Sequence, residues 1–365
     1  MANSQTMTLE QLRAQIDEID QQLVKLLNQR ADMVLGVKQA KERDRIDIYS
    51  PARETQILER VRKLAEGGNF PIAALERIFT AIISGTRSLI GELSVGYLGP
   101  ECSSAYDASI KQFGENLRLN PEPSVETIIR RVEHGDFHYG VIPIETSSTG
   151  IAVPTIQALR ESRLEIVAEI EIRNRLAIIG PASSDGWVKV KRIFGDAYSI
   201  WSVSNWLRIN LPLVETVVVE TTAEAVKRAS EDPSAAIIAS ESAAARFNLS
   251  VLASGVENDQ NSEARFVVVG FNTPPPTGRD KTSVLLTVSD RAGVLRDVLR
   301  PFADRGLTLL KIESKPFRNH GNGYIFYVDV AGHRSDPALN AAIEELKSLC
   351  SECKVFGSYP IALPK

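Results

Sequence analysis

Four basic side chains in the N-terminal segment are spaced so that they could serve one anionic ligand. Arg13, Arg30 and Lys41 lie in one stretch of helical periodicity, and Arg53 lies in the next. At about 100° per residue, Arg30 and Lys41 point within about 20° of each other, whereas Arg13 points about 100° away from Arg30. A second, antiparallel copy could bring Arg13 in. Converging cations suit a small dicarboxylate; the alternative from spacing alone is solvated surface charge.

Three polar stretches adjoin predicted strands farther along the chain. They are Gly99-Pro100-Glu101, the run Glu145-Thr146-Ser147-Ser148, and the turn Ser262-Glu263-Ala264-Arg265. Ligands of α/β sheets bind beyond the carboxyl ends of strands, so we expect these stretches to form ligand loops. Arg265 is a candidate for an anion, whereas Ala264 beside it has no group that can donate a proton.

The elements that must position these groups fall into three segments. Residues 1–92 have helical periodicity, with a first helix of some 35 residues, a break, and a second helix that Ser50 caps and Pro51 begins. A helix of that length predicts an extended dimeric bundle. Residues 94–272 alternate apolar strands with helices and predict a mostly parallel α/β sheet. After a Pro-rich linker (274–280), residues 280–365 follow the ferredoxin-like order βαββαβ.

Composition narrows the class of protein. The chain has 365 residues, a formal net charge of −4, three Cys and four His. The charge balance gives no reason to expect nucleic acid or an anionic membrane as a partner. No apolar run reaches the length of a membrane span, and the first residues lack a signal-peptide pattern. We therefore expect a cytoplasmic protein without a disulfide scaffold or a metal site.

The first segment resembles the all-helical chorismate mutase family. The resemblance rests on LRAQIDEIDQQLVKLLNQRADMVLGVKQAK and SPARETQILERV. It implies that Arg13 and Arg30 hold the carboxylates of chorismate, that Lys41 faces the ether oxygen, and that Arg53 and Glu54 complete a two-chain pocket. The implied reaction is a pericyclic rearrangement that needs no cofactor. Ile90 stands where the family has Gln or Glu, and losing that donor costs about 10²–10³ in rate.

The middle segment resembles the prephenate dehydratase family through VGYLGPE, GVIPIETSSTG, AAIIASESAA and ARFVVVG. The resemblance implies a periplasmic-binding-protein-like α/β fold in which Ser103, Thr146, Ser147, Arg265 and Phe266 bind substrate. Several motif positions depart from the family, and Ala264 replaces the Thr that is the favoured proton donor. Because hydroxide leaves poorly, the reaction needs such a donor. Ser103, Thr146, Asp196 and Tyr198 form an alternative donor set, or else make only ordinary loop hydrogen bonds.

The last segment resembles the phenylalanine-sensing ACT domain. Gly293-Val294-Leu295 and Glu313-Ser314-Lys315-Pro316 match its two motifs. The resemblance implies that Gly293, Val294, Leu295, Glu313 and Ser314 bind the effector, since a Gly turn before a helix exposes backbone N–H groups suited to a carboxylate. The alternative is that these residues only form a turn and fill the hydrophobic core.

Taken together, the three segments resemble the bifunctional chorismate mutase/prephenate dehydratase family of phenylalanine biosynthesis. The resemblance implies a multidomain protein that binds chorismate, prephenate and L-phenylalanine. We expect it to be a homodimer. Two further readings stay open because of Ile90 and Ala264. One is an enzyme that does different chemistry on a chorismate- or prephenate-like dicarboxylate, such as decarboxylation without aromatisation. The other is a catalytically impaired amino-acid sensor.

Overall fold

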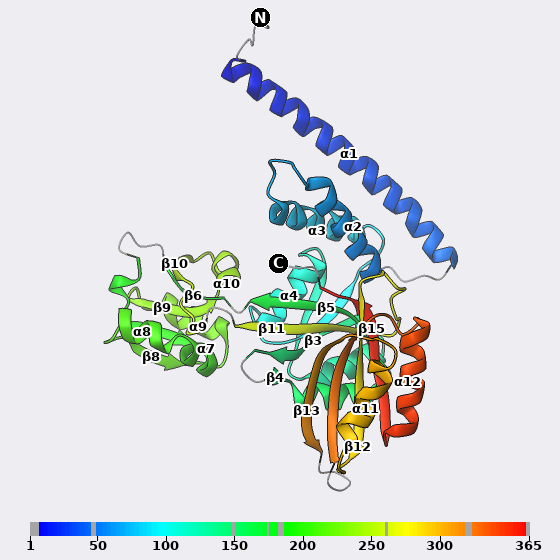
Figure 1. The fold of residues 1–365 in the computed structure, drawn as a ribbon. Helices are drawn as coiled ribbons and strands as arrows, with labels where there is room; N and C mark the ends of the chain where they lie inside the picture. Colours follow the sequence, from blue (N-terminus) through cyan, green and yellow to red (C-terminus); the bar gives the residue numbers. More distant parts are fainter. Residues whose placement is uncertain are drawn as a thin grey trace, which may run out of the picture.

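The computed structural model describes residues 7–44, 49–147, 150–173, 175–181, 186–259, 262–317 and 323–362. Figure 1 shows three parts in chain order: N-terminal helices, a unit of two lobes, and a four-stranded sheet with two helices. The predicted fold class, all-α followed by α/β and then α+β, is confirmed.

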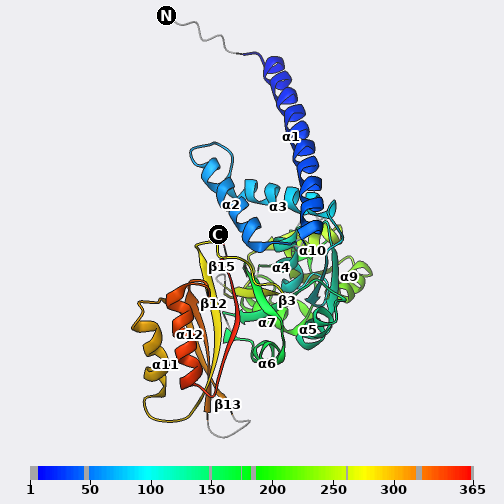
Figure 2. The ribbon, with the colours of Figure 1, turned by 90° about the vertical axis from the view of Figure 1, so that its right-hand side faces the viewer.

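The N-terminal part consists of three helices, α1 (Leu9–Asp44), α2 (Pro51–Ala65) and α3 (Ile72–Ser88). Ser50 caps α2 as predicted, because its side chain accepts a hydrogen bond from the Arg53 N–H at 3.4 Å. Helix α1 runs outward from the rest of the molecule in both views (Figures 1 and 2). Its apolar stripe is consequently exposed in the single chain, at Leu12, Ile16, Ile19, Leu23, Leu26 and Leu27.

The first lobe of the middle unit is a six-stranded sheet with helices packed on it. The strand order is β2-β1-β3-β11-β5, and β4 pairs with β3. The strands are β1 (Ser94–Leu98), β2 (Arg118–Glu122), β3 (Tyr139–Thr146), β4 (Gly150–Ile151), β5 (Glu165–Arg173) and β11 (Glu263–Gly270). The helices are α4 (Ser104–Phe113), α5 (Val125–Glu133) and α6 (Val153–Glu161).

The second lobe is a separate five-stranded sheet of order β10-β6-β9-β7-β8. Its strands are β6 (Leu176–Gly180), β7 (Arg192–Gly195), β8 (Glu215–Val218), β9 (Ala235–Ser240) and β10 (Ser250–Ser254). Its helices are α7 (Ala197–Ser202), α8 (Ser204–Asn210), α9 (Thr222–Ser230) and α10 (Glu241–Arg246).

The prediction of one mostly parallel sheet was wrong for this unit. Two sheets form, and β1–β2, β1–β3, β7–β8 and β7–β9 are the parallel pairs. The chain passes between lobes from β5 to β6 and returns from β10 to β11, and all four of these strands pair antiparallel with their neighbours. Apolar strand runs do not reveal this direction, because they record burial and not orientation.

The C-terminal part has the predicted order, with β12 (Asp280–Ser289), α11 (Val294–Ala303), β13 (Leu309–Phe317), β14 (Gly323–Ala331), α12 (Pro337–Leu349) and β15 (Glu352–Pro360). The sheet order is β13-β14-β12-β15, the ferredoxin-like arrangement, and every neighbouring pair is antiparallel. Figure 2 shows α11 and α12 on the side of this sheet that faces away from the first lobe.

The opposite face of the C-terminal sheet shares a core with the first lobe. Ile144 and Ile166 of the first lobe pack in one cluster with Leu285, Phe356 and Tyr359. The strands approach so closely that a Cβ atom at Gly357 would lie 2.2 Å from the backbone oxygen of Ile166. The two parts are therefore joined by a continuous apolar interior in addition to the linker.

Candidate active site

A cavity of about 420 Å³ lies between the two lobes of the middle unit. Pro100, Cys102 and Ser103 line it from the loop after β1, and Asp196 and Tyr198 line it from the second lobe. The two crossings between lobes contribute a further part of the wall, with Arg173, Arg175, Glu257, Asn258 and Ser262. This is the position at which two-lobed α/β proteins bind small ligands, between sheets and beyond strand ends.

Ser103 lies in this cleft as the predicted ligand loop requires, but its hydroxyl already has two partners. It caps α4 by accepting a hydrogen bond from the Tyr106 N–H at 3.3 Å, and it donates to the Leu98 carbonyl at 3.2 Å. Cys102 precedes it with a left-handed φ of 62°. Burial raises the pKa of the Cys102 thiol to about 11, so the group keeps its proton at neutral pH.

Asp196 and Tyr198 also line the cleft, but the side chain of Asp196 is engaged in capping a helix. Asp196 caps α7, with one oxygen accepting the N–H groups of Tyr198 and Ser199 at 3.0 Å each and the other accepting the Ser199 hydroxyl. Its oxygens are thus occupied in holding the helix start. The Tyr198 side chain is 48% exposed and lies beside Trp201, with ring centroids 6.1 Å apart. Its hydroxyl remains available to a bound molecule.

The cleft holds two cations that the sequence argument missed as ligands for an anion. Among the described lining residues, Arg173 and Arg175 are the basic ones, and both lie where β5 leads into β6. The Arg173 Nε lies 3.5 Å from the Glu263 carboxylate. The signal was present as the charged R-N-R between two apolar strand runs. Five carboxylates also line the cleft: Asp107, Asp196, Glu220, Glu257 and Asp259.

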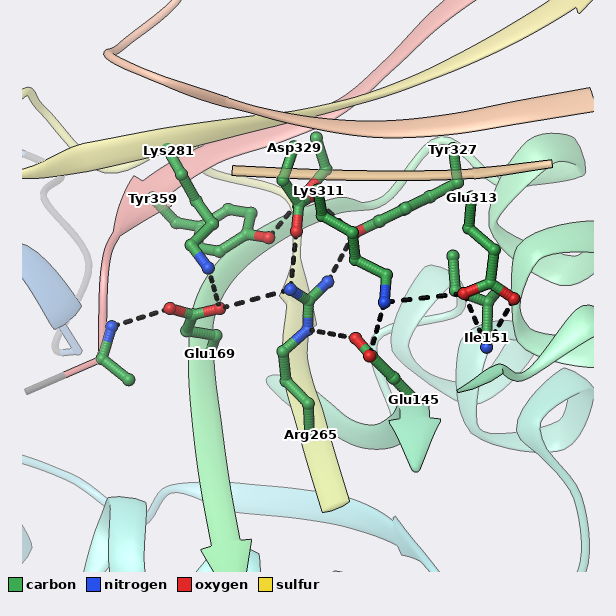
Figure 3. Close-up of polar contacts among 12 residues, drawn as sticks. Glu145, Ile151, Glu169, Arg265, Lys281, Lys311, Glu313, Tyr327, Asp329 and Tyr359 are labelled. Atoms are coloured by element: carbon green, nitrogen blue, oxygen red, sulfur yellow. Dashed lines mark hydrogen bonds and ion pairs between the residues drawn. The ribbon is translucent and has the colours of Figure 1, made fainter. Parts of the chain in front are cut away.

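Arg265 does not line the cleft, contrary to its expected role as a carboxylate ligand. Successive residues of a strand point to opposite faces, so Ala264 and Phe266 pack toward α4 while Arg265 points toward the C-terminal sheet. Its guanidinium donates to Asp329 at 2.6 Å and to the Tyr327 hydroxyl at 2.8 Å (Figure 3). Burial raises the pKa of Asp329, but Arg265 and Lys281 outweigh it and lower that pKa overall.

Thr146 and Ser147 lie at the end of β3, beside β11, and neither is among the residues that line the cleft. Thr146 stands opposite Ala264 in the strand register. Ser147 exchanges hydrogen bonds with Glu263, at 2.9 Å from its N–H and 3.1 Å to its hydroxyl. Ser148, the last residue of the predicted loop, lies outside the described residues. Phe266 is 4% exposed and belongs to the core.

The residues predicted for the mutase pocket are only partly brought together in one chain. Arg30 is half-buried and donates to the Thr86 hydroxyl of α3 at 2.6 Å. Arg13 and Arg53 are exposed on α1 and α2. Lys41 lies in α1, but its side chain is outside the described part of the structure. Because the predicted pocket takes Arg13 from a second copy, one chain carries only part of it.

Glu54 is paired with Arg87, which the sequence argument did not single out. The Arg87 guanidinium donates to the Glu54 carboxylate at 2.8 Å and to the Phe113 carbonyl at 2.5 Å. It also lies over the rings of Tyr49 and Phe113, at 5.5 and 5.6 Å from their centroids. Ile90, with no polar group in its side chain, lies two residues beyond α3.

The predicted effector residues lie at two places in the C-terminal part. Gly293 precedes α11 with a left-handed φ of 79°, a conformation that glycine adopts readily, and Val294 and Leu295 begin the helix. Glu313 and Ser314 lie on β13, the edge strand of the sheet. Burial raises the pKa of Glu313, but hydrogen bonds from Lys315 and the Ile151 N–H lower it overall.

The described ranges of the chain offer neither a cluster of metal ligands nor a membrane-spanning helix. No group of three or more His, Cys, Asp and Glu side chains in these ranges could hold a metal ion. No described helix is both long enough and apolar enough to cross a bilayer.

Three family models match the chain in the order of its parts. They describe chorismate mutase type II (residues 12–90), prephenate dehydratase (95–274) and the ACT domain (282–348). Among curated proteins, the bifunctional chorismate mutase/prephenate dehydratase of Aquifex aeolicus is 35% identical, over 97% of this chain and 98% of its own. The Pseudomonas aeruginosa protein of the same description is 32% identical over the same shares.

A solved structure is similar to the last two parts. Prephenate dehydratase of Arthrobacter aurescens, in complex with L-Phe, superimposes with a TM-score of 0.66 and 26% identity, covering 74% of this chain and 90% of that one. Sequence identity above 30% along nearly the whole length, with three matched domains in the same order, decides the assignment. The chain belongs to the family of bifunctional chorismate mutase/prephenate dehydratases.

Proposed function

We propose that the protein converts chorismate to prephenate in its N-terminal helices and prephenate to phenylpyruvate in the cleft between lobes. The observation that supports this proposal most strongly is the match to bifunctional relatives over 97% of the chain. The proposal divides the chain into a mutase domain (1–92), a dehydratase domain (94–272) and an ACT regulatory domain (280–365). Neither reaction calls for a cofactor, and L-phenylalanine is the proposed feedback effector.

In this proposal the mutase pocket forms between two copies of the chain. The exposed leucines and isoleucines of α1 support a homodimer, because such a stripe is buried when a second helix covers it. Arg13 of one copy would join Arg30, Lys41, Arg53 and Glu54 of the other around the dicarboxylate. Fixed cations then stabilise negative charge that grows on the ether oxygen. Sedimentation of the purified protein, with Leu23→Glu as the disrupting variant, tests the dimer.

For the dehydratase step, we assign the carboxylates of prephenate to Arg173 and Arg175, at the crossing from β5 to β6. Their position in the cleft supports this assignment, since Arg265 is engaged with Asp329 elsewhere. The departing hydroxide needs a proton, and we assign that donation to Tyr198. Within the donor set considered, Ser103 and Asp196 are occupied as helix caps. Thr146 and Ser147 would then hold the hairpin of β3 and β4 beside Ala264, rather than donate a proton to the substrate.

A second function has specific support in the cleft. Ala264 lacks the hydroxyl of the favoured donor, and five carboxylates accompany the two arginines. This favours a related substrate with less negative charge, or a reaction that does not expel water. Purified protein incubated with chorismate and then with prephenate separates the functions when products are resolved by chromatography. Phenylpyruvate at enzymatic turnover supports the proposal, and a different product supports the second function.

A further inference from the structure

Strand β13 of the ACT domain directs alternate side chains at the dehydratase domain. Lys311, Glu313 and Lys315 occupy every second position, so they share one face of the strand. Figure 3 shows Lys311 and Glu313 reaching from the C-terminal sheet toward β3 and β4. Thus the strand that carries the predicted effector residues Glu313 and Ser314 also touches the domain that they would regulate.

The two side chains hold opposite limbs of one hairpin. Lys311 donates to the carboxylate of Glu145, near the end of β3. Glu313 accepts the backbone N–H of Ile151, in β4, with its two oxygens at 3.1 and 3.2 Å. Glu145 and Ile151 face each other in the register of the hairpin. Ser147, two residues after Glu145, exchanges hydrogen bonds with Glu263, whose carboxylate lies 3.5 Å from the cleft residue Arg173. We call the contacts of Lys311 and Glu313 the hairpin clamp.

Local geometry indicates that the clamp is built into the fold. A Cβ atom at Gly150 would lie 2.7 Å from the Glu313 carboxylate, and Gly150 has a φ of 68°. The left-handed φ favours a glycine at that position, and the absence of a Cβ leaves room for the carboxylate. The side chains of Glu145, Lys311 and Glu313 are 21 to 23% exposed, which shields their attraction from water.

The clamp also continues into the buried charges between the domains. Glu145 lies 3.6 Å from the Nε of Arg265, whose guanidinium pairs with Asp329. Lys311 lies 3.5 Å from Glu313, and Lys315 lies 3.0 Å from it. Opposite charges therefore alternate from the ACT sheet to the end of β3. A change at Glu313 alters the partner of Lys311 and, through it, the position of Glu145.

We propose that Lys311 and Glu313 are positioning residues of the dehydratase, and that an amino acid bound at β13 inhibits by taking Glu313 away from the hairpin. This rests on the proposed dehydratase function and effector site. An α-ammonium group donates up to three hydrogen bonds and carries a full charge, so it competes with the Ile151 N–H for the same carboxylate. Released from Glu313, the hairpin loses one of its two anchors.

The test uses full-length protein with three variants and one matched control. Lys311→Met removes the anchor at β3, Lys311→Arg keeps its charge, and Glu313→Ala removes the acceptor at β4. Lys347→Met is the control, because it breaks an exposed pair with Glu344 on α12. Mutase turnover in the same samples reports folding of the chain. Dehydratase kcat and KM, inhibition by L-phenylalanine, and hydrogen exchange of the amides in 145–151 are measured.

We expect Lys311→Met to raise the KM for prephenate about tenfold, the scale of one lost charge-assisted hydrogen bond, with kcat within about twofold. Lys311→Arg should restore KM. Glu313→Ala should speed exchange at Ile151, impair the dehydratase without any effector, and remove the further response to L-phenylalanine. Unchanged KM in Lys311→Met, or unchanged exchange in Glu313→Ala, overturns the clamp. If the parent protein makes no phenylpyruvate, the proposed function fails. The clamp is still tested in that case, because faster exchange at Ile151 in Glu313→Ala supports it and unchanged exchange overturns it.

Discussion

Arg87 and Glu54 form a buried ion pair, 2.8 Å long, that ties the start of α2 to α3. The second nitrogen of the same guanidinium reaches the last residue of α4, in the neighbouring domain. The opposite end of α4 begins at the cleft. One arginine thus connects a residue proposed for the mutase pocket with a helix that borders the dehydratase cleft.

Replacing Arg87 by methionine should destabilise the protein strongly. The change leaves the Glu54 carboxylate and the Phe113 carbonyl without their donor in a site where Arg87 is 6% exposed. Breaking such a pair costs about 3–5 kcal/mol. Denaturant titration measures the loss, and Arg77→Met, an exposed change on the same helix, serves as the control. Equal stability of the two variants would show that the pair contributes nothing.

Tyr198→Phe should lower dehydratase kcat by about 10²-fold, the usual scale for losing a proton donor, and should leave mutase kcat unchanged. The cleft keeps its aromatic wall in this variant because only the hydroxyl is removed. Trp201→Phe, which alters the adjacent ring without removing a hydroxyl, is the matched control. The assignment is wrong if phenylpyruvate forms at the parental rate in the Phe variant.

Ala264→Thr alone should not raise dehydratase activity to the level of the relatives. Residue 264 is 3% exposed, is packed against the α4 side of the sheet, and is not among the residues that line the cleft. A hydroxyl added at this position therefore enters a packed interior rather than the cleft. Steady-state assays of the variant and parent on prephenate provide the measurement. A rise of 10² or more would mean that the other differences matter little.

Cys102 should alkylate slowly in the native protein at pH 8. Burial raises the pKa of its thiol to about 11, and the thiolate is the reactive form. The rate should climb as pH approaches 11. Peptide mapping after iodoacetamide treatment measures the modification, with denatured protein as the reference for an accessible thiol. Rapid labelling of native Cys102 at pH 8 would contradict the buried environment.

The contact between Arg265 and Asp329 should contribute to acid sensitivity. The pKa of Asp329 is lower in the folded chain than its ordinary value of 3.8, so the folded state binds its proton less readily than the unfolded state. The contribution is therefore complete above about pH 4 and is lost as pH falls through the lower folded value. Unfolding midpoints from pH 7 to pH 2 should show a smaller acid loss in Asp329→Asn. Parallel curves for the two proteins would refute this.

Much of the fold was predictable because periodicity records burial. The apolar stripe of α1, the cap at Ser50 and the order of the C-terminal strands all follow from local patterns. The division of the middle segment into two sheets was not predictable, because strand direction depends on where the chain crosses between lobes.

The site was predicted less well, for a reason that Arg265 illustrates. Its motif correctly marked a strand beside the cleft, but the side chain points to the opposite face, toward Asp329. Which face of a strand meets a ligand is decided by the domain packed behind it. Arg87 was missed because its importance comes from Glu54 and Phe113, which are distant in sequence.

The close approach of Gly357 to Ile166 affects how this protein can be dissected. Family boundaries invite a cut near residue 275 to release an autonomous dehydratase. Such a cut would remove Leu285, Phe356 and Tyr359 from the shared core and leave an exposed apolar surface on the remaining fragment. The dehydratase and ACT domains should thus fold as one unit, and a useful excision must leave them together.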